Sequence, residues 1–313
     1  MQYNYRNLPK HHRIVSDLPN TTAPSHDPTA SSTTSTDRAQ STPAQANMAS
    51  KDQVKYTNKL DNTNILILGG SSGLGYGVAE ACLEYNAAHV YISSSSPQRV
   101  DKAVKSLQAS YPSKSDRVHG HACDLGDEKT LEDNIKQLLE KVARTKKLDH
   151  IVFTAGDALA QMALKDVSLE KIQKAGMVRF YAPLLLAKHA PGFMMPGPHS
   201  SITLTTGNVF EKPMPDWSVI GAYAGGLMSM TKNLALDLKP IRVNLVSPGA
   251  VETELWNGMP EEQRKAFLKS HGEKMATGRI GQVADVVEGY LFAMRDENAT
   301  AGLIQTNSGA LIV

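Results

Sequence analysis

The chain has 313 residues, of which 41% are hydrophobic and 20% are charged, and its formal net charge is +2. These values are typical of a globular protein with one large or two small domains, and the balanced charge argues against nucleic-acid binding. No apolar run approaches the ~20 residues of a membrane span, so we expect no membrane contact. The two cysteines, Cys82 and Cys123, lack metal-ligand spacing and indicate a reduced, cytoplasmic setting without a metal site.

Residues 1–57 differ in composition from the rest of the chain. Between Thr21 and Ser50, small and polar residues dominate and branched apolar residues are almost absent. Such a segment cannot bury enough surface to offset the entropy lost on ordering. We therefore predict a disordered extension over residues 1–57, followed by a single domain over residues 58–313. A mis-called start upstream of Met48 is an open alternative.

The stretch Asn64–Gly77, which reads NILILGGSSGLGYG, organises the chain. It predicts a buried strand over Asn64–Gly69, a tight glycine turn and a helix over Leu74–Tyr85. The turn leaves backbone N–H groups at the positive end of the helix dipole, where a pyrophosphate binds well. Glycines allow the sharp turn and the close approach of a ligand. The alternative is an ordinary strand-to-helix loop.

Strand-like and helix-like patterns alternate from there to the end of the chain. Further strands are predicted at His89–Ser93, Arg117–Cys123, His150–Thr154, Ser201–Thr205, Ile241–Val246 and Leu303–Thr306. Further helices are predicted at Pro97–Ala109, Glu128–Ala143, Leu169–His189 (bent at Pro183), Ala222–Leu238 and Val283–Met294. This alternation predicts an α/β fold with a doubly wound parallel sheet covered on both faces, a three-layer Rossmann-type arrangement. Ligands then bind at the carboxyl ends of the strands.

The end of the second strand indicates which dinucleotide binds. It reads SSSSPQR over residues 93–99 and contains no carboxylate. An NAD site usually has Asp or Glu there, which accepts from the ribose 2′-OH and repels a 2′-phosphate. Hydroxyl donors and a nearby guanidinium suit the extra phosphate of NADP. We predict NADP contacts at Ser93, Ser94, Ser95 and Arg99; a serine loop indifferent to both cofactors is the alternative.

About 250 residues, from Leu60 to Val313, resemble the short-chain dehydrogenase/reductase family. The motifs are the glycine turn Gly69–Gly75, Asp124-Leu125, Thr154-Ala155-Gly156, Arg242-Val243-Asn244 and Pro248-Gly249 with Thr253. The resemblance implies cofactor contacts from Gly69, Ser71, Ser72, Gly73, Leu74, Gly75, Asp124, Leu125, Ala155, Gly156, Arg179, Pro248, Gly249, Val251 and Thr253. It also implies a small-molecule substrate and a homodimer or homotetramer formed through Leu169–His189 and Ala222–Leu238.

The family's catalytic Tyr-x-x-x-Lys pair has no counterpart here. Threading back from Thr231 puts its tyrosine position at Ile220 and its lysine position at Ala224. Tyr223 lies one place before that lysine position, and its own partner four residues later would be Leu227, which carries no ammonium. A tyrosine without a cationic partner titrates near ~10 and is a poor acid at neutral pH.

The remaining catalytic positions also depart from the family. The serine position falls at Thr205 or Thr206, of which we favour Thr206, and the family's asparagine falls at Arg179. Arginine almost never donates a proton, so Arg179 is expected to bind an oxyanion, a carboxylate or a cofactor phosphate. Our candidate catalytic residues are Arg179, Thr206 and Tyr223, with Asp216 and Lys232 as further polar residues nearby.

Three interpretations follow from the missing pair. In the first, the substrate is already an activated electrophile, such as an iminium ion or a polarised enone. In the second, another group of the protein supplies the proton. In the third, the domain is a nucleotide-binding scaffold or shapes a cyclisation. The pattern SITLTTG, followed by PMPDW over residues 213–217, resembles an atypical branch that includes fungal NADP-dependent reductases of specialised-metabolite pathways. We expect residues 251–275 to form a helical lid, with Trp217 and Trp256 flanking the pocket mouth.

Overall fold

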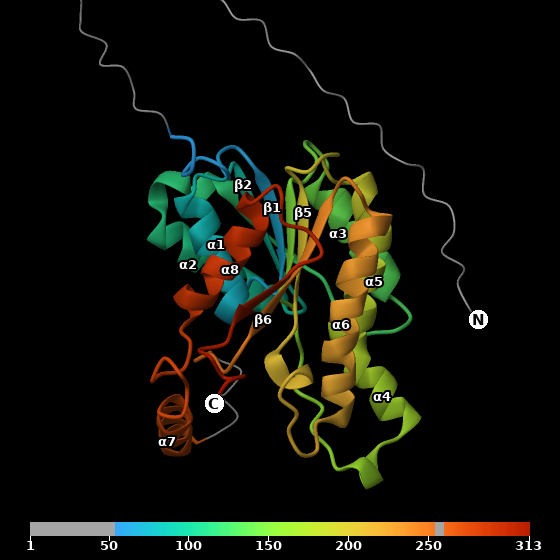
Figure 1. The fold of residues 1–313 in the computed structure, drawn as a ribbon. Helices are drawn as coiled ribbons and strands as arrows, with labels where there is room; N and C mark the ends of the chain where they lie inside the picture. Colours follow the sequence, from blue (N-terminus) through green and yellow to red (C-terminus); the bar gives the residue numbers. More distant parts are fainter. Residues whose placement is uncertain (1–53, 254–259) are drawn as a thin grey trace, which may run out of the picture. The chain divides into compact units, whose positions relative to one another are not determined.

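The computed structural model describes residues 54–253 and 260–313, which are built around a seven-stranded parallel sheet. The strands are β1 (Asn64–Leu68), β2 (His89–Ser94), β3 (Val118–Ala122), β4 (His150–Phe153), β5 (Ser201–Thr205), β6 (Arg242–Pro248) and β7 (Leu303–Thr306). Their order is β3-β2-β1-β4-β5-β6-β7, so the winding reverses between β1 and β4 (Figure 1). The predicted α/β fold with a doubly wound parallel sheet is confirmed.

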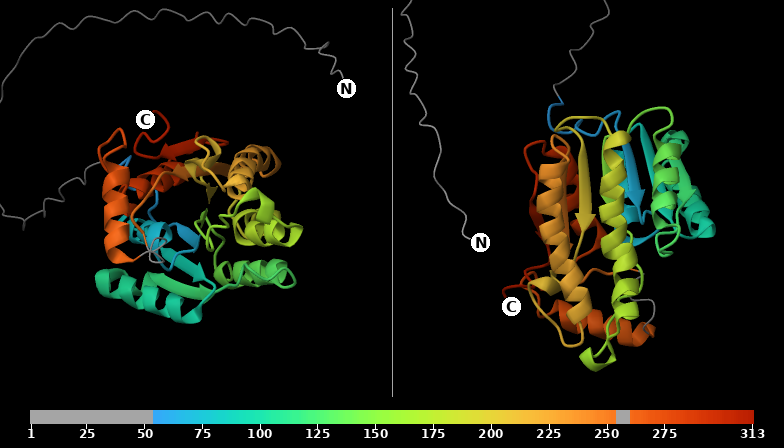
Figure 2. Two further views of the ribbon diagram at one scale, coloured as in Figure 1. Left: turned by 90° about the horizontal axis from the view of Figure 1, so that it is seen from below. Right: turned by 90° about the vertical axis from the view of Figure 1, so that its right-hand side faces the viewer.

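Helices cover both faces of this sheet. They are α1 (Gly73–Glu84), α2 (Pro97–Ser110), α3 (Leu131–Val142), α4 (Leu169–Gly176), α5 (Ala182–His189), α6 (Ser218–Asp237), α7 (Glu261–Gly272) and α8 (Val283–Arg295). Short 3₁₀ turns lie at Pro112–Arg117, Leu164–Asp166, Ala190–Gly192 and Asn208–Phe210. Helices α1, α2 and α8 pack on one face, and α3, α5 and α6 pack on the other (Figures 1 and 2).

The central strand β1 is buried over its whole length because helices cover both of its faces. Ile65 and Ile67 pack with residues of α1 and α8, while Leu66 and Leu68 pack with residues of α3, α5 and α6. The glycine turn therefore begins where a rigid strand ends. Helices α4 and α7 extend beyond this carboxyl edge of the sheet (Figure 1).

The predicted helix over Leu169–His189 is interrupted. Helix α4 ends at Gly176, a π-helical turn spans Met177–Tyr181, and α5 begins at Ala182. The interruption has a local cause, since Pro183 lacks an N–H and its ring would collide with the carbonyl four residues earlier, at Arg179. The interruption places Arg179 in a widened turn of a type often found at functional sites.

Helix α6 begins at Ser218, one turn before the predicted start at Ala222. The prediction was wrong there because Gly221, Gly225 and Gly226 weaken the helical pattern in the first turns. The residue before the N-cap, Asp216, has a left-handed backbone with φ of +64°. Tertiary packing against the turn at Asn208–Phe210 holds this weak start in place.

The remaining predictions concern residues outside the described structure, membrane spans, metal sites and oligomerisation. The predicted disordered extension lies outside it except for residues 54–57, and Trp256 lies outside it as well. Within the described parts no helix is both long and apolar enough to cross a membrane, and no three His, Cys, Asp or Glu side chains are grouped to hold a metal ion. Leu169, Leu184 and Leu236 are exposed on α4, α5 and α6, and the homo-oligomer stays a prediction.

Candidate active site

The glycine turn after β1 brings the backbone of two strands into close contact. Gly69 has φ of +88°, and a Cβ there would lie 2.5 Å from the backbone nitrogen of Ala155. The amides of Gly69 and Gly70 both donate to the carbonyl of Ser93, at 2.8 and 3.1 Å. A side chain at Gly75 would collide with the Gly69 carbonyl and with Thr154. Glycine is therefore required by packing at both positions, and the turn is held rigidly between β1, β2 and β4.

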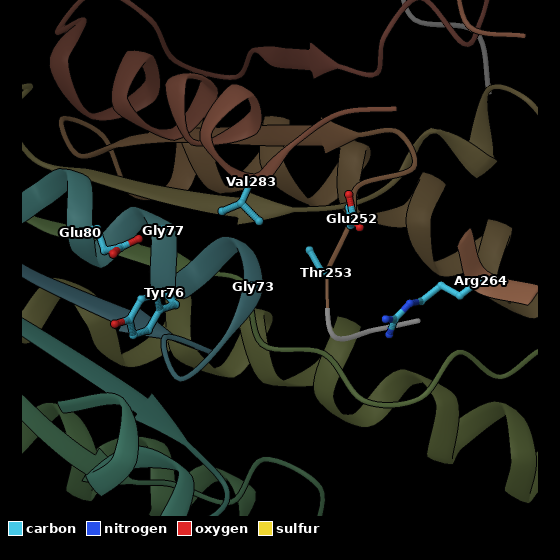
Figure 3. Close-up of a pocket in the computed structure, with 8 residues that line it drawn as sticks. All are labelled: Gly73, Tyr76, Gly77, Glu80, Glu252, Thr253, Arg264 and Val283. Atoms are coloured by element: carbon cyan, nitrogen blue, oxygen red, sulfur yellow. The ribbon is translucent and has the colours of Figure 1, made fainter. Parts of the chain in front are cut away.

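The N-terminus of α1 keeps its polar groups available. Ser72 is the N-cap residue, yet its side chain makes no capping hydrogen bond, and the first turn contains no acidic residue. Such a helix start presents unpaired N–H groups and the positive end of the dipole. Together with the Ser71 and Ser72 hydroxyls, the turn fits the diphosphate of a dinucleotide. Gly73 also lines an open cleft at this end (Figure 3).

The serine loop after β2 places a cation beside a hydroxyl. Arg99, in the first turn of α2, donates from Nη2 to the Ser95 hydroxyl at 2.9 Å, and its amide is capped by Ser96 at 3.3 Å. Ser93 is buried and contributes its carbonyl to the glycine turn, while Ser94 remains partly exposed. The structure thus brings Ser95 and Arg99 together, which is the arrangement that a 2′-phosphate requires.

The predicted adenine contacts lie after β3 and differ in character. Asp124 is exposed, and its Oδ1 accepts from the amide of Gly126 at 2.9 Å. Leu125 is only 6% exposed and packs in the core with residues of α3. A cofactor would therefore meet the Asp124 carboxylate but only the backbone of Leu125.

Arg179 lies across the end of β4. A Cβ at Gly156 would come within 2.8 Å of its Nη1 and Nη2 atoms, so the guanidinium lies directly over this glycine. Its Nε donates to Oδ1 of Asp157 at 3.1 Å, and its Nη2 donates to the Asp157 carbonyl. Burial lowers the pKa of Arg179, and the Asp157 charge opposes that shift. The sequence analysis missed Asp157, although its place directly after Thr154-Ala155-Gly156 was a usable signal.

The two threonines at the end of β5 point in different directions. Thr205 donates to the Phe153 carbonyl at 2.7 Å and meets the Tyr290 hydroxyl at 2.8 Å, within the core. Thr206 donates to the Ala224 carbonyl at 3.0 Å. Because Ala224 is the residue threaded onto the family's lysine position, this bond places Thr206 beside the expected catalytic helix turn. Of the two threonines, only Thr206 lies beside that turn.

Tyr223 does not face the turn of α6 at Ala224 that Thr206 contacts. Its hydroxyl donates to the Ile172 carbonyl at 2.9 Å and meets the Tyr181 hydroxyl at 3.3 Å, and its ring packs on Phe180 with centroids 5.1 Å apart. Burial, followed by the bond with Tyr181, raises the pKa of Tyr223 to about 12. The α6 register thus turns Tyr223 toward α4, and a catalytic role for Tyr223 stays a prediction. Lys232 is exposed further along α6.

The segment after β6 closes the site from the other side. Gly249 passes so close to the next strand end that a Cβ would lie 2.9 Å from Asn307. Val251 pairs with Gly281 in a short bridge and is 6% exposed, so its side chain belongs to the core. Thr253 lines the same cleft as Gly73. Pro248 ends β6 in the buried sheet.

The Arg242-Val243-Asn244 motif is structural here. The Arg242 guanidinium is buried and donates to the carbonyls of Ala293 and Met294 at the end of α8, at 2.6 and 2.8 Å. Asn244 donates to the Ala299 carbonyl at 2.7 Å. These residues fix α8 and the approach to β7, and so hold the strand end that carries Pro248.

The comparisons agree with this geometry. A family model described as an SDR-like Rossmann domain matches residues 56–313. The chain belongs to the short-chain dehydrogenase/reductases. This SDR chain is 41% identical over 259 residues to the short-chain dehydrogenase/reductase fsr5 of Gibberella fujikuroi, covering 82% of this chain and 98% of that protein. The predicted resemblance to fungal members of the family is confirmed.

Two solved structures are similar to this SDR chain. The MalC reductase/Diels-Alderase of Malbranchea aurantiaca is 38% identical with a TM-score of 0.78, covering 83% of this chain and 100% of that one. A small-chain dehydrogenase in complex with NADPH is 27% identical with a TM-score of 0.64, covering 81% and 100% of the two chains. The relatives therefore span the whole domain, including every element that carries the site.

Proposed function

We propose that this SDR chain is an NADP(H)-dependent reductase that delivers hydride to an activated C=N or C=O/enone centre of a specialised metabolite. The observation that carries the proposal is the chemistry around Thr206. The positions of the family's phenol and ammonium are held by Ile220 and Ala224, and Tyr223 faces α4 instead. The site retains binding groups but no acid with a pKa near neutrality among the side chains that we have placed in it.

The cofactor assignment rests on two features of this chain. The α1 N-terminus and the glycine turn fit a diphosphate, and the Arg99–Ser95 pair fits a 2′-phosphate. The NADPH complex of the relative that is 27% identical supports the same choice. When bound, NADPH supplies the hydride; this chain supplies orientation and exclusion of water.

The missing acid restricts the substrate. Reduction of a neutral ketone produces a strongly basic alkoxide that must gain a proton, whereas hydride addition to an iminium carbon produces a neutral amine and needs none. An activated ketone or enone gives a less basic alkoxide or enolate, which can take its proton from solvent after hydride transfer. The Thr206 hydroxyl can hold a substrate heteroatom, and Arg179 can hold an oxygen of the substrate or of the cofactor through its Nη1 edge. Neither group is a proton donor of useful strength at neutral pH.

The test measures NADPH oxidation at 340 nm with cyclic iminium ions, activated ketones and simple ketones. We expect turnover on the activated electrophiles and negligible turnover on simple ketones. Arg179→Ala should lower kcat/KM more than about tenfold, because it removes a charged hydrogen-bond donor from a partly buried site. Turnover of simple ketones at rates equal to those of activated substrates would contradict the proposal.

A second candidate is a nucleotide-binding scaffold or a cyclase-like protein. The missing Tyr–Lys pair favours it, as does the similarity to MalC, which is described as both reductase and Diels-Alderase. NADPH binding that enhances nicotinamide fluorescence, together with no oxidation on any electrophile, would favour this candidate.

A further inference from the structure

Strands β2 and β3, the latter at the edge of the sheet, carry a row of ring side chains on one face. Val90, Ile92 and Val118 pack in the core with residues of α1, α2 and α8. Because side chains alternate along a strand, the residues between these three face the opposite way. We call this set the ring cluster, which consists of His89, Tyr91, His119 and His121.

The rings of the cluster pack on one another. Tyr91 stacks on His119 and on His121, with ring centroids 5.0 and 6.3 Å apart. Nδ1 of His89 lies 3.0 Å from Nε2 of His119, so one imidazole donates a hydrogen bond to the other. The sheet register produces this arrangement, since Tyr91 lies directly beside His119. The four side chains therefore form one ordered aromatic wall.

An open groove of about 580 Å³ lies along the ring cluster. Lys141, Arg144 and Thr145 line it from the end of α3 and the turn that follows. Asp101 and Val104 of α2 line it around the edge strand β3. The volume lies within the ~300–1,000 Å³ that is typical of small-molecule sites.

The groove is separate from the predicted cofactor site. His89 is the first residue of β2, whereas the serine loop that we assign to NADP follows Ser94, the last residue of the same strand. None of the described lining residues of the groove is a predicted cofactor contact. A ligand in the groove is therefore expected to bind independently of NADP(H).

Two cations give the groove a positive charge. Lys141 and Arg144 form no ion pair among the described residues, and Asp101 is the one carboxylate in the described lining. Burial, followed by the neighbouring histidines, lowers the pKa of His119, and burial, followed by the Lys141 charge, lowers the pKa of His121. Both imidazoles are therefore uncharged at neutral pH and supply ring surface and N–H groups.

We propose that this groove binds a planar aromatic carboxylate, which packs its ring on the ring cluster while Lys141 and Arg144 bind its carboxylate. Aromatic rings attract one another in offset-stacked and edge-to-face contacts. Ammonium and guanidinium groups form charge-assisted hydrogen bonds with a carboxylate. The inference does not depend on the proposed NADP(H) dependence or on the reductase activity.

The experiment titrates the protein with 2-naphthoate and follows the Hε1 resonances of its histidines by NMR. Single His→Gln variants assign the signals. We expect the signals of His119 and His121 to shift, because their rings would contact the naphthalene. The signal of His199, which lies before β5 and outside the groove, should not move.

A pair of double variants tests the charges. Lys141→Ala/Arg144→Ala should weaken 2-naphthoate binding about five- to tenfold, because two partly screened charge contacts are lost. The matched control is Lys129→Ala/Lys136→Ala, which removes the same charge at and before α3 from residues that do not line the groove. The control should stay within about twofold of the parent, and thermal unfolding of each variant checks that α3 is intact.

Two further ligands separate the contributions. 2-Naphthamide has the same rings without the charge, so it should bind the parent more weakly than 2-naphthoate does and bind the Lys141→Ala/Arg144→Ala variant equally well. Saturating NADPH should leave 2-naphthoate binding unchanged.

Several outcomes would overturn the proposal. They are unmoved His119 and His121 signals at the solubility limit of 2-naphthoate, equal losses in the two double variants, and displacement of 2-naphthoate by NADPH. Shifts of the same signals with protein concentration alone would show a second copy of the chain on this face and would overturn it as well. A failed reductase assay has no bearing on these results.

Discussion

The substitution Gly156→Ala tests whether the position of Arg179 matters. The added methyl would lie 2.8 Å from Nη1 and Nη2, and since ordinary contact begins at 3.4 Å, the guanidinium must retreat by about 0.6 Å. Gly156 has no left-handed backbone angle, so alanine itself is not strained there. The retreat loosens the 3.1 Å bond from Nε to Asp157.

A displacement of about 1 Å in a positioning group can lower a rate by ~10²-fold, so 0.6 Å should lower kcat/KM roughly tenfold. The loss in free energy of unfolding should be small, because the Arg179 and Asp157 side chains are 31% and 40% exposed. Ion pairs that are exposed to this extent contribute at most ~1 kcal/mol, since solvent screens them. The assay is NADPH oxidation with a cyclic iminium substrate, beside thermal unfolding.

The matched control for this prediction is Gly192→Ala, where an added methyl would meet no atom within 4 Å. It should keep parental activity and stability. If Gly156→Ala is as active as the parent, Arg179 does not position substrate or cofactor, and the reasoning built on its contacts fails. Activity lost in proportion to unfolding would point to general damage of β4 instead.

Three further perturbations address the cofactor, the threonine pair and acid stability. Arg99→Ala should weaken NADPH binding about tenfold and leave NADH binding unchanged, because only NADPH carries the 2′-phosphate; equal losses would show that Arg99 acts through the fold. Thr205→Val should lower the free energy of unfolding by about 1–3 kcal/mol with kcat/KM retained, whereas Thr206→Val should lower kcat/KM; the reverse pattern would exchange their roles. Burial, aided by the Arg242 charge, lowers the pKa of His150 to about 3, so the unfolded chain binds a proton that the folded chain excludes. Stability is therefore complete above about pH 6.5 and lost as the pH falls toward 3, by about 2 kcal/mol between pH 6.5 and 5. Urea unfolding at several pH values should show this slope, and His150→Asn should reduce it.

Part of the site was predictable because its information is local. The strand, turn and helix of residues 64–84 follow from an apolar run, glycines and helical spacing, and the structure reproduces them within one residue. The sequence also predicts that the Tyr–Lys pair is missing, because threading from Thr231 puts Ile220 and Ala224 at its positions. The interruption near Pro183 has an equally local cause.

The direction of a polar side chain depends on partners that are distant in sequence. The direction of the Thr205 side chain was decided by Tyr290, 85 residues after Thr205. The direction of Tyr223 was not predictable either, because its partner at Ile172 lies 51 residues away, on a helix whose position the motifs do not encode.

The amino-acid sequence by itself determined the α/β fold and the glycine turn, because hydrophobic period and residue identity are properties of short segments. Only the tertiary structure decided that Asp157 holds Arg179 over Gly156 and that the end of α3 borders the ring cluster of β2 and β3. Those contacts arise where separate strands and helices pack together, and no short segment contains both partners in their final geometry.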